Sequence, residues 1–387
     1  MNIVWKNTSD PDFELYRCIF ETKYRFKFRS DRFQREFVLR NIESAVHGRY
    51  SNISAPIWVG VKLTNRCNLS CKHCWTENKN YSPSLDEIKL MLDKLYHAHV
   101  KFIGFSGGEL FIRKDILEIL KYAKSKNFII ELFTNGTLIT STLLDSLERI
   151  LDKKVDVIQI SLDGISEYSI KEQRGLSSAN RILWSIEEFI KRGYIVRISY
   201  VVTNTNIEDV VPTFCEIDKM GASGFSVSAV YPILKGVEEH KKLDMTQYYR
   251  KLYEIINIPH KTELQFFLQI DFFERVSHYI EDLSVETDHN GFLECGFASW
   301  FIDANGNVYP EFQLCYEELM GGNIYHDSIS SIVQKFSSIK LLSNGRSLQN
   351  TDCAKCIFEP LCLRHSYDQA FEKYRQFNYK NPYCKMR

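Results

Sequence analysis

Strand and helix patterns alternate along the middle of this chain, and this alternation limits its possible folds more than any other feature. Six apolar segments rich in β-branched and aromatic residues are expected to be strands: 57–63, 100–105, 128–133, 155–162, 195–202 and 224–230. Segments with helical spacing lie between them, at 85–96, 112–124, 141–150, 179–191 and 207–219. This order predicts an α/β fold, in which a parallel sheet forms a partial (β/α)6 barrel with its helices outside. An active site is then expected at the carboxyl ends of the strands.

The alternating pattern ends near residue 235 and divides the chain into regions. We expect an N-terminal lead-in over 1–54, the barrel over 55–235, a bridging region over 236–294 and a cysteine-rich domain over 295–387. In the bridging region we expect a helix over 243–256 and a strand over 263–270. In the cysteine-rich domain we expect a helix over 329–342.

Composition and charge exclude several classes of function. The 49 Lys and Arg residues are balanced by 49 Asp and Glu residues, so the chain lacks the net basic charge of a general nucleic-acid binder. No segment approaches the roughly 20 apolar residues of a membrane helix, and the N-terminus lacks the pattern of a signal peptide. We therefore expect a cytoplasmic protein with no nucleic-acid or membrane partner. Its eleven cysteines, an odd number, favour metal binding, catalysis or core packing over a disulfide framework.

Three cysteines stand close together in the loop after the first expected strand. Cys67, Cys71 and Cys74 follow one another at spacings of four and three residues. Thiolates so arranged bind zinc or an iron–sulfur cluster. Zinc would need a fourth ligand, for which His73 or a distant residue is a candidate, whereas a four-iron cluster on three cysteines leaves one iron open. Because unprotected thiols this close are prone to oxidation, a metal site is favoured over three reduced cysteines.

The Cys-x3-Cys-x2-Cys motif after a first strand resembles that of the radical S-adenosylmethionine (SAM) superfamily. Three further features match the family in chain order at successive strand ends: Gly107-Gly108-Glu109, Thr134-Asn135-Gly136, and Ser161 with Asp163. Arg174 resembles an arginine that contacts SAM in a subset of the family. Taken singly, these features are typical of turns, a helix cap and a surface residue. Their joint placement carries the resemblance, and Leu110, where many members have proline, is a departure from it.

The resemblance implies a [4Fe–4S] cluster on Cys67, Cys71 and Cys74, with SAM chelating the open iron. Glu109 is then expected to bind the SAM ammonium, Arg174 its carboxylate, and Ser161 and Asp163 the ribose hydroxyls. The SAM site would also include Gly107, Gly108, Thr134, Asn135 and His73. Reductive cleavage of SAM would give methionine and a 5′-deoxyadenosyl radical that abstracts a hydrogen atom from the substrate.

A second group of cysteines predicts another metal site near the C-terminus. Cys353, Cys356, Cys362 and Cys384 offer four thiolates, which suit either zinc or a four-iron cluster. Together with Cys295 and the segment from Gly306 to Pro310, they resemble the SPASM extension of radical SAM enzymes, which usually carries two auxiliary clusters. Glu311 and Ser366 occupy two of its usual cysteine positions. We therefore expect one auxiliary [4Fe–4S] cluster, and a second only if Cys315 or Glu311 joins Cys295.

The resemblance implies a radical SAM oxidoreductase that matures a ribosomally made peptide, for example by oxidative cross-linking. Its partners would be that peptide and a low-potential electron donor such as flavodoxin or ferredoxin. The short lead-in leaves open a small-molecule or cofactor-precursor substrate, as in a dehydrogenase or a tetrapyrrole-type enzyme. A non-catalytic zinc scaffold is the alternative outside the enzyme class. Glu311, Tyr309 and Asp271 are candidate catalytic groups because they lie near the expected domain junction, and surface or packing roles are the alternative for each.

Overall fold

The structure is a computed structural model. It describes residues 2–25, 55–74, 76, 80–175, 178–232, 235–284, 299–339, 352–362, 367–377 and 379–386. All statements about the structure below refer to these residues.

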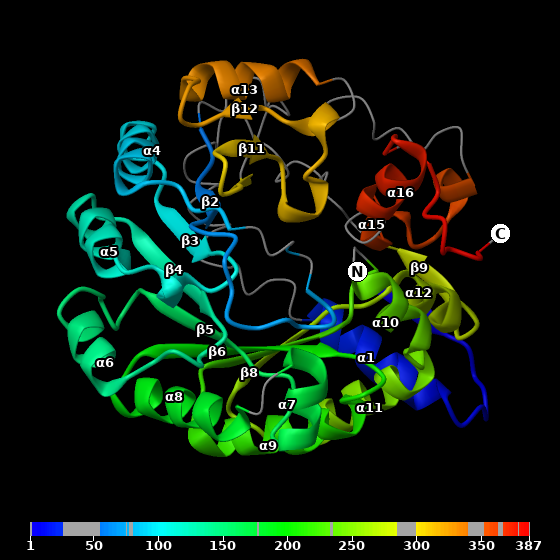
Figure 1. The fold of residues 1–387 in the computed structure, drawn as a ribbon. Helices are drawn as coiled ribbons and strands as arrows, with labels where there is room; N and C mark the ends of the chain where they lie inside the picture. Colours follow the sequence, from blue (N-terminus) through cyan, green and yellow to red (C-terminus); the bar gives the residue numbers. More distant parts are fainter. Residues whose placement is uncertain are drawn as a thin grey trace.

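The six expected barrel strands all form, and they pair in chain order as parallel neighbours. They are β2 (Trp58–Lys62), β3 (Phe102–Ser106), β4 (Ile129–Thr134), β5 (Val157–Ser161), β6 (Ile195–Val202) and β7 (Gly224–Ala229). Helices α4 (Leu85–His97), α5 (Ile116–Ser125), α6 (Ser141–Glu148), α8 (Ala179–Lys191) and α9 (Val210–Met220) lie outside them (Figure 1). Alternate strand residues such as Ile130 and Leu132 are fully buried, because a sheet covered by helices needs apolar side chains at these positions. The partial α/β barrel is thus confirmed.

The described sheet extends beyond these six strands at both edges. On one side β8 (Glu263–Phe266) pairs parallel with β7. On the other, β10 (Ser299–Ile302) pairs parallel with β2, and β11 (Asn307–Tyr309) and β12 (Gly322–Asn323) follow as antiparallel strands. Because β10 comes from the C-terminal region, backbone hydrogen bonds join that region directly to the barrel (Figure 1).

Several element boundaries differ from the sequence-based expectation. The helix expected over 112–124 is split into a 3₁₀ turn, η3 (Leu110–Ile112), and α5, because Arg113 is extended with ψ 127°. The helix expected over 207–219 begins with a 3₁₀ turn, η4 (Ile207–Asp209), which α9 follows. The strand expected over 263–270 ends at Phe266, and α12 (Ile270–Ser277) follows. The last expected helix is α13 (Ile329–Ser338), and residues 340–342 lie outside the described residues.

One helix of the barrel was not expected, although it contributes to the site. It is α7 (Glu167–Arg174), which is polar and therefore lacks a clear apolar stripe. Its ends carry the local signals instead. Ser166 caps the first turn by accepting a hydrogen bond from the backbone of Ser169, and Gly175 ends the helix with a φ of 76°.

The two ends of the chain meet near the bridging region. Strand β1 (Asn2–Trp5) pairs with β9 (Ile280–Ser284), and α1 (Phe13–Arg25) packs on α11 (Met245–Asn257) and α12. The C-terminal region adds η5 (Phe312–Leu314), η6 (Glu317–Leu319), η8 (Asp352–Lys355), α15 (Glu359–Cys362) and α16 (Tyr367–Tyr374). Phe358, fully buried, contacts Phe20 of α1 and Phe273 of α12 with ring centroids 6.3 and 5.5 Å apart. This aromatic contact attaches the C-terminal cysteine segment to the bridging helices.

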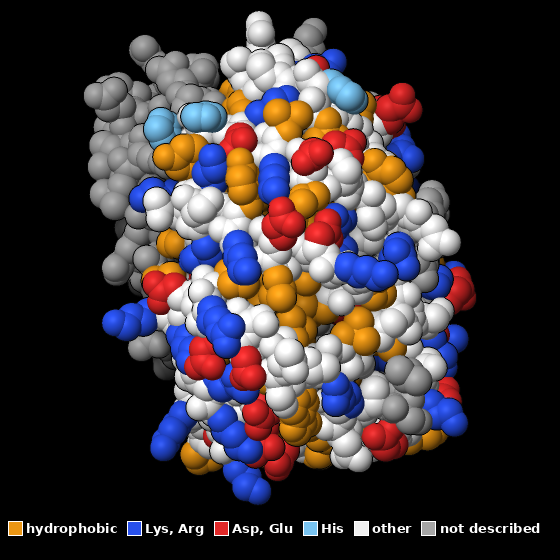
Figure 2. Space-filling model, turned by 60° about the vertical axis from the view of Figure 1, so that its left-hand side comes forward, with side chains coloured by type: hydrophobic (Ala, Val, Ile, Leu, Met, Phe, Trp, Pro, Cys, Tyr) orange, Lys and Arg blue, Asp and Glu red, His pale blue; other side chains and the backbone are white. Residues whose placement is uncertain are grey.

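Acidic and basic side chains are interspersed on the face that carries α4, α5 and α6 (Figure 2). Ion pairs such as Lys89–Glu118 and Lys126–Asp93, at 2.7 and 2.6 Å, join neighbouring helices there. None of the described helices is both long and apolar enough to cross a membrane.

Candidate functional site

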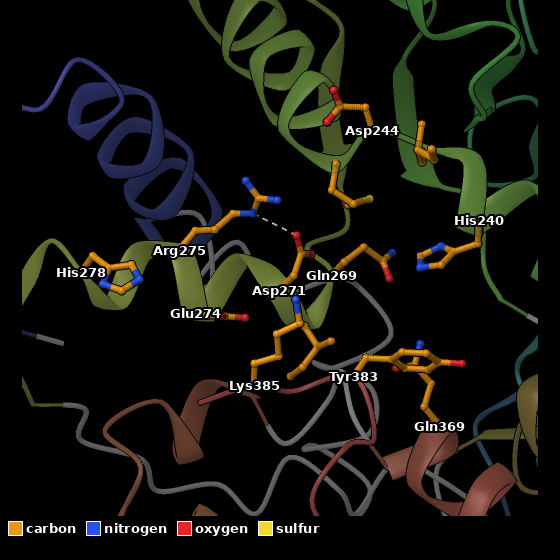
Figure 3. Close-up of a pocket in the computed structure, with 13 residues that line it drawn as sticks. His240, Asp244, Gln269, Asp271, Glu274, Arg275, His278, Gln369, Tyr383 and Lys385 are labelled. Atoms are coloured by element: carbon orange, nitrogen blue, oxygen red, sulfur yellow. Dashed lines mark hydrogen bonds and ion pairs between the residues drawn. The ribbon is translucent and has the colours of Figure 1, made fainter. Parts of the chain in front are cut away.

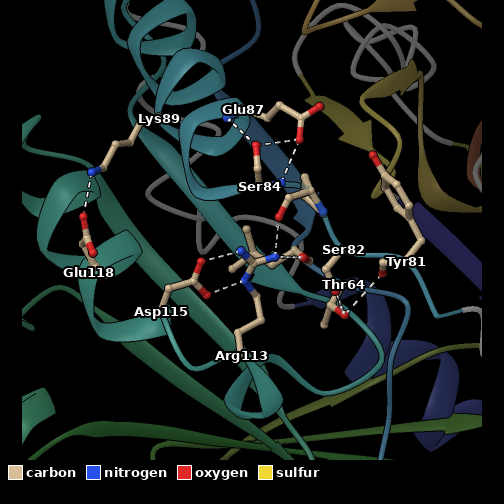
Figure 4. Close-up of polar contacts among 11 residues, drawn as sticks. Thr64, Tyr81, Ser82, Ser84, Glu87, Lys89, Arg113, Asp115 and Glu118 are labelled. Carbon is tan, nitrogen blue, oxygen red and sulfur yellow. Dashed lines mark hydrogen bonds and ion pairs between the residues drawn. The ribbon is translucent and has the colours of Figure 1, made fainter.

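The first three cysteines lie in the loop over 63–83, between β2 and α4, and all three are half-buried. Both ends of this loop are held by one guanidinium group (Figure 4). Arg113 donates hydrogen bonds to the carbonyl oxygens of Leu63 and Pro83, each at 2.8 Å. Asp115 fixes the guanidinium with two further bonds of 3.0 and 2.7 Å. Sequence reasoning missed this arginine, because no motif marks it.

The two glycines at the end of β3 allow close contact with the cysteine loop. A Cβ atom on Gly108 would lie 2.2 Å from the carbonyl oxygen of Arg66, and one on Gly107 would lie 2.8 Å from that of Thr64. The backbone amides of Gly108 and Glu109 donate to these same two carbonyl oxygens, to Thr64 at 2.8 Å and to Arg66 at 2.9 Å. Because Gly107 and Gly108 have no side chains, the backbone at the end of β3 packs directly against the start of the cysteine loop.

The Glu109 carboxylate is buried and held by three donors. It accepts hydrogen bonds from the Thr134 hydroxyl at 2.8 Å and from the backbone amides of Asn135 and Phe111 at 2.7 and 3.1 Å. Only 1% of the residue is exposed, and burial raises the pKa of Glu109. The Asn135 side chain also donates to Asn68 in the cysteine loop at 3.0 Å. The ends of β3 and β4 thus fix a carboxylate beside the three cysteines.

An ion pair lies beneath the same loop. The Arg174 guanidinium stands 2.7 Å from the Asp163 carboxylate, and Nε2 of His73 stands 3.5 Å from it. Asp163 is fully buried and Arg174 is 3% exposed. The Arg174 carbonyl oxygen accepts a hydrogen bond from the backbone of Ser70, which ties α7 to the cysteine loop. Asp163 and Arg174, which the resemblance assigns to different parts of SAM, therefore contact each other, while Ser161 lies half-buried at the end of β5.

Several polar atoms in this cluster are buried without a protein partner among the described residues. They include Nδ1 of His73, Oε1 of Gln173 and Nε of Arg174. A buried unsatisfied polar group costs about 1–3 kcal/mol, so such groups are expected where a polar ligand binds. Burial lowers the pKa of His73, which keeps its imidazole neutral.

The four C-terminal cysteines lie in one short region of the described chain. All are half-buried, and Cys356, Cys362 and Cys384 pack against the hydrophobic core. The backbone amide of Cys356 donates to Cys353 at 3.0 Å, within η8 and the turn that follows it. Burial raises the pKa of the Cys384 thiol, and the nearby Cys356 raises it further. Cys295 and Ser366 lie outside the described residues.

The remaining candidates are divided between two places. Tyr309 is buried at the end of β11, where burial raises its pKa to about 12, and Glu311 precedes η5. Cys315 follows that turn and donates to the Phe312 carbonyl oxygen at 3.3 Å. Asp271 lies elsewhere, in α12, and lines a cavity. These candidates therefore do not form one catalytic group.

Among the described residues, no three His, Cys, Asp or Glu side chains surround a single metal ion. A four-iron cluster does not require such an arrangement, because each of its thiolate ligands binds a different iron atom.

Residues 61–214 match the model of the Radical SAM superfamily. The chain carries a radical SAM domain. Its curated relatives include the AdoMet-dependent heme synthase of Methanosarcina barkeri, 24% identical over 86% of this chain and 97% of that protein. The antilisterial bacteriocin subtilosin biosynthesis protein AlbA of Bacillus subtilis is 27% identical over 79% of this chain and 66% of its own length. The mycofactocin maturase MftC of Mycolicibacterium smegmatis is 29% identical over 79% of this chain and 76% of that protein.

Solved structures share the fold of this chain. Streptococcus suis SuiB bound to its precursor peptide SuiA aligns over 91% of this chain and 81% of SuiB, with a TM-score of 0.71 and 18% identity. The enzyme anSMEcpe with bound AdoMet aligns over 85% of this chain and 94% of its own, with a TM-score of 0.63 and 18% identity.

Radical SAM domains use a [4Fe–4S] cluster and SAM, and the residues present fit both groups. Three half-buried thiols lie in one loop, and the fixed carboxylate of Glu109 lies beside them. The Nε of Arg174 lacks a partner among the described residues. Burial raises the pKa of Cys71 to about 12, so this thiol stays protonated until a metal cation displaces its proton. The three thiols can bind an iron–sulfur cluster. The Glu109 carboxylate and the unpartnered Nε of Arg174 can bind a ligand that carries both an ammonium and a carboxylate, as SAM does.

Proposed function

We propose that this radical SAM enzyme modifies a peptide, by oxidative cross-linking or another maturation step on a ribosomally made precursor. The observation that carries the proposal is that a radical SAM barrel is followed by a C-terminal region that holds four further cysteines and pairs with the barrel sheet through its strand β10. The relatives include a bacteriocin biosynthesis protein and a mycofactocin maturase, and the fold is that of SuiB, solved with a precursor peptide. A domain pair of this kind supports a peptide substrate.

In this proposal the residues of the barrel bind and orient the cofactors. Cys67, Cys71 and Cys74 hold the cluster, which together with SAM supplies a radical able to abstract a hydrogen atom from an unactivated carbon. Glu109 receives the SAM ammonium, because its carboxylate is fixed and its oxygen atoms can accept more than their three present bonds. Arg174 offers its unpartnered Nε to the SAM carboxylate while Asp163 holds the guanidinium in place.

The C-terminal cysteines hold an auxiliary [4Fe–4S] cluster in this proposal. Such a cluster can accept an electron from a substrate radical, which oxidative bond formation requires. The primary cluster needs an electron of low potential, so the expected partner is a flavodoxin or a ferredoxin.

The test uses any small peptides that prove to be encoded beside the gene. Each is incubated under anaerobic conditions with SAM, dithionite and the reconstituted enzyme, and the product is weighed by mass spectrometry. A cross-link is expected to remove two hydrogen atoms from one of these peptides. The enzyme with Cys67, Cys71 and Cys74 all changed to Ala is the control. No mass change in any encoded peptide, with turnover of a small metabolite, would contradict the proposal.

A small-molecule substrate is the second candidate, because the heme synthase of Methanosarcina barkeri matches over 97% of its own length. Incubation with iron-containing porphyrin precursors distinguishes the two. Loss of the porphyrin substrate that depends on SAM, without peptide modification, would favour this candidate.

A further inference from the structure

Five polar side chains surround the end of β5, and we call them the polar ring: His73, Asp163, Gln173, Thr203 and Asn206. Gln173, which precedes Arg174 in α7, is the fully buried member to which no role has been assigned. Its amide nitrogen donates a hydrogen bond to the hydroxyl of Thr203, just beyond β6. Its backbone carbonyl oxygen accepts one from the backbone amide of Lys72 at 2.9 Å. Gln173 therefore connects the end of β6 with the cysteine loop.

Asn206, which is 1% exposed, fixes one side of the polar ring. Its amide nitrogen donates to the carbonyl oxygens of Asp163 and Val201 at 3.0 and 2.9 Å. Its amide oxygen accepts from the backbone amide and from the hydroxyl of Thr203, at 2.7 and 3.2 Å. Because the Thr203 hydroxyl uses its only hydrogen in the bond to Asn206, it can only accept from Gln173. The nitrogen of the Gln173 amide must then face Thr203, and its oxygen must face away from it.

The opposite side of the polar ring is open at one link. The amide oxygen of Gln173 and Nδ1 of His73 are both buried, and neither forms a hydrogen bond of normal geometry with a described residue. The two residues are neighbours, because the backbone of Gln173 is bonded to Lys72, which precedes His73. Burial lowers the pKa of His73, and the contact with Gln173 raises it to a smaller extent. Since an amide oxygen accepts and an imidazole N–H donates, the two unpartnered atoms can satisfy each other.

The second ring nitrogen of His73 lies in the proposed SAM site. Nε2 is 3.5 Å from the Asp163 carboxylate, the group that the resemblance assigns to the ribose of SAM. A ribose carries two adjacent hydroxyl groups, each of which can both donate and accept a hydrogen bond. A ring nitrogen and a carboxylate oxygen at this separation suit such a pair of hydroxyls. His73 can contribute to this contact only while its imidazole keeps the orientation seen here.

We propose that Gln173 is a positioning residue of the SAM site: its amide oxygen accepts the Nδ1–H of His73 and so holds Nε2 beside Asp163, where it contacts a ribose hydroxyl of SAM. Gln173 itself does not touch SAM in this arrangement. Thr203 holds the Gln173 amide in the required orientation, and Asn206 holds Thr203. The inference rests on the proposed SAM site and is independent of whether the substrate is a peptide.

The experiment measures SAM binding to the full chain, reconstituted with iron and sulfide under anaerobic conditions and left oxidised so that SAM is not cleaved. Equilibrium dialysis with radiolabelled SAM gives the dissociation constant. Gln173→Leu removes the amide and keeps the approximate size of the side chain, and His73→Phe keeps a ring and removes both nitrogens. Each variant is expected to bind SAM about tenfold more weakly than the wild type, which corresponds to about 1.4 kcal/mol.

The double variant separates positioning from a purely structural role. If Gln173 acts through His73, the double variant should bind SAM about tenfold more weakly than the wild type rather than about a hundredfold, because His73→Phe has already removed the group that Gln173 positions. A glutamine that merely supported α7 would lower the affinity for SAM equally in both backgrounds. Thr203→Val, which removes the hydroxyl that holds the amide, is a second variant and should show the same lack of additivity with His73→Phe.

Gln369→Leu is the matched control. Gln369 is a buried amide in α16 that accepts a hydrogen bond from Asn381 at 2.6 Å, and it lines the same cavity as Asp271 (Figure 3). The substitution therefore removes a buried amide of the same kind outside the polar ring, and it should leave the affinity for SAM unchanged. Iron content and melting temperature show that each variant is folded and loaded.

Wild-type affinity for SAM in either Gln173→Leu or His73→Phe would overturn the inference. So would a loss of about a hundredfold in the double variant, since Gln173 would then act independently of His73. A wild-type protein that binds no SAM would refute the proposed SAM site and this inference with it. Failure of the peptide proposal is separate, because it appears as unmodified encoded peptides whatever the affinity for SAM is.

Discussion

Replacing Asp163 by Asn tests whether the buried ion pair holds Arg174 in place. The substitution keeps the side-chain shape and an oxygen that can still accept the backbone amide of Val201, now 3.0 Å away. It removes the negative charge 2.7 Å from a guanidinium that is 3% exposed. Breaking one partner of such a buried pair costs about 3–5 kcal/mol, because the remaining charge is left uncompensated. At about 3 kcal/mol, the ratio of folded to unfolded protein falls by about two orders of magnitude.

The assay is urea unfolding of the metal-free protein, followed by tryptophan fluorescence under reducing conditions. Asp163→Asn and Arg174→Met should each lower the midpoint, whereas the double variant should recover most of the loss, because two well-packed neutral groups leave no buried charge. Glu148→Gln, which breaks surface ion pairs with Lys153 and Arg192, is the control and should change the midpoint far less, because such pairs contribute about 0–1 kcal/mol each. If both single variants unfold like the wild type, the pair does not hold a buried charge and the positioning role of Asp163 is wrong.

Three further outcomes are expected, two at the cysteines and their loop and one at the N-terminal cap of α4. Changing Cys67, Cys71 and Cys74 together to Ala should leave about four irons per chain after reconstitution, because four C-terminal thiolates remain to bind one cluster. About eight irons would mean a second auxiliary cluster. No iron would mean that the C-terminal cysteines bind zinc or are structural thiols. Gly108→Ala should destabilise the protein by about 1–3 kcal/mol and lower iron binding at the first cysteine loop, because the added Cβ would lie 2.2 Å from the Arg66 carbonyl oxygen. An iron content equal to that of the wild type would contradict this expectation. The backbone amide of Ser84 holds the pKa of Glu87 below its usual value, so Glu87→Gln should reduce stability at neutral pH. That difference should vanish as the pH falls below the lowered pKa of Glu87, and unfolding midpoints measured from pH 3 to pH 7 would show whether the two curves converge.

The barrel strands could be predicted because each is a short segment rich in β-branched and aromatic residues, a local pattern that needs no distant partner. Strand β7 begins at the expected residue, and helix α8, predicted from its helical spacing, has the expected bounds. The pairing of β10 with β2 was not predictable. Four residues carry too little pattern, and the partner lies far away along the chain. The polar helix α7 was not predicted for a related reason. Its stability comes from its caps and tertiary contacts rather than from an apolar stripe that the sequence would show.

The motifs indicated which residues would approach one another, but not how they would interact. The resemblance to the radical SAM motifs implied that Glu109 lies near the three cysteines, and the structure adds the donors that fix its carboxylate. Asp163 and Arg174 each matched a ligand-binding role, whereas their contact with each other depends on where α7 packs. Arg113 had no sequence signal, because its role is to join two carbonyl oxygens that only the folded loop brings together.

The described residues of the cysteine loop have little regular structure of their own, so their arrangement depends on the strand ends and the helix that surround them. Arg113 holds the two ends of the loop, Gly108 contacts it from the end of β3, and Asn135 binds it from the end of β4. The carbonyl oxygen of Arg174 holds it from α7. Since these contacts come from segments far apart in the sequence, they exist only after the barrel has assembled. The three thiols are thus brought together by the folded barrel rather than by the loop sequence, and a cluster bound there would in turn stabilise the assembled barrel through the same contacts.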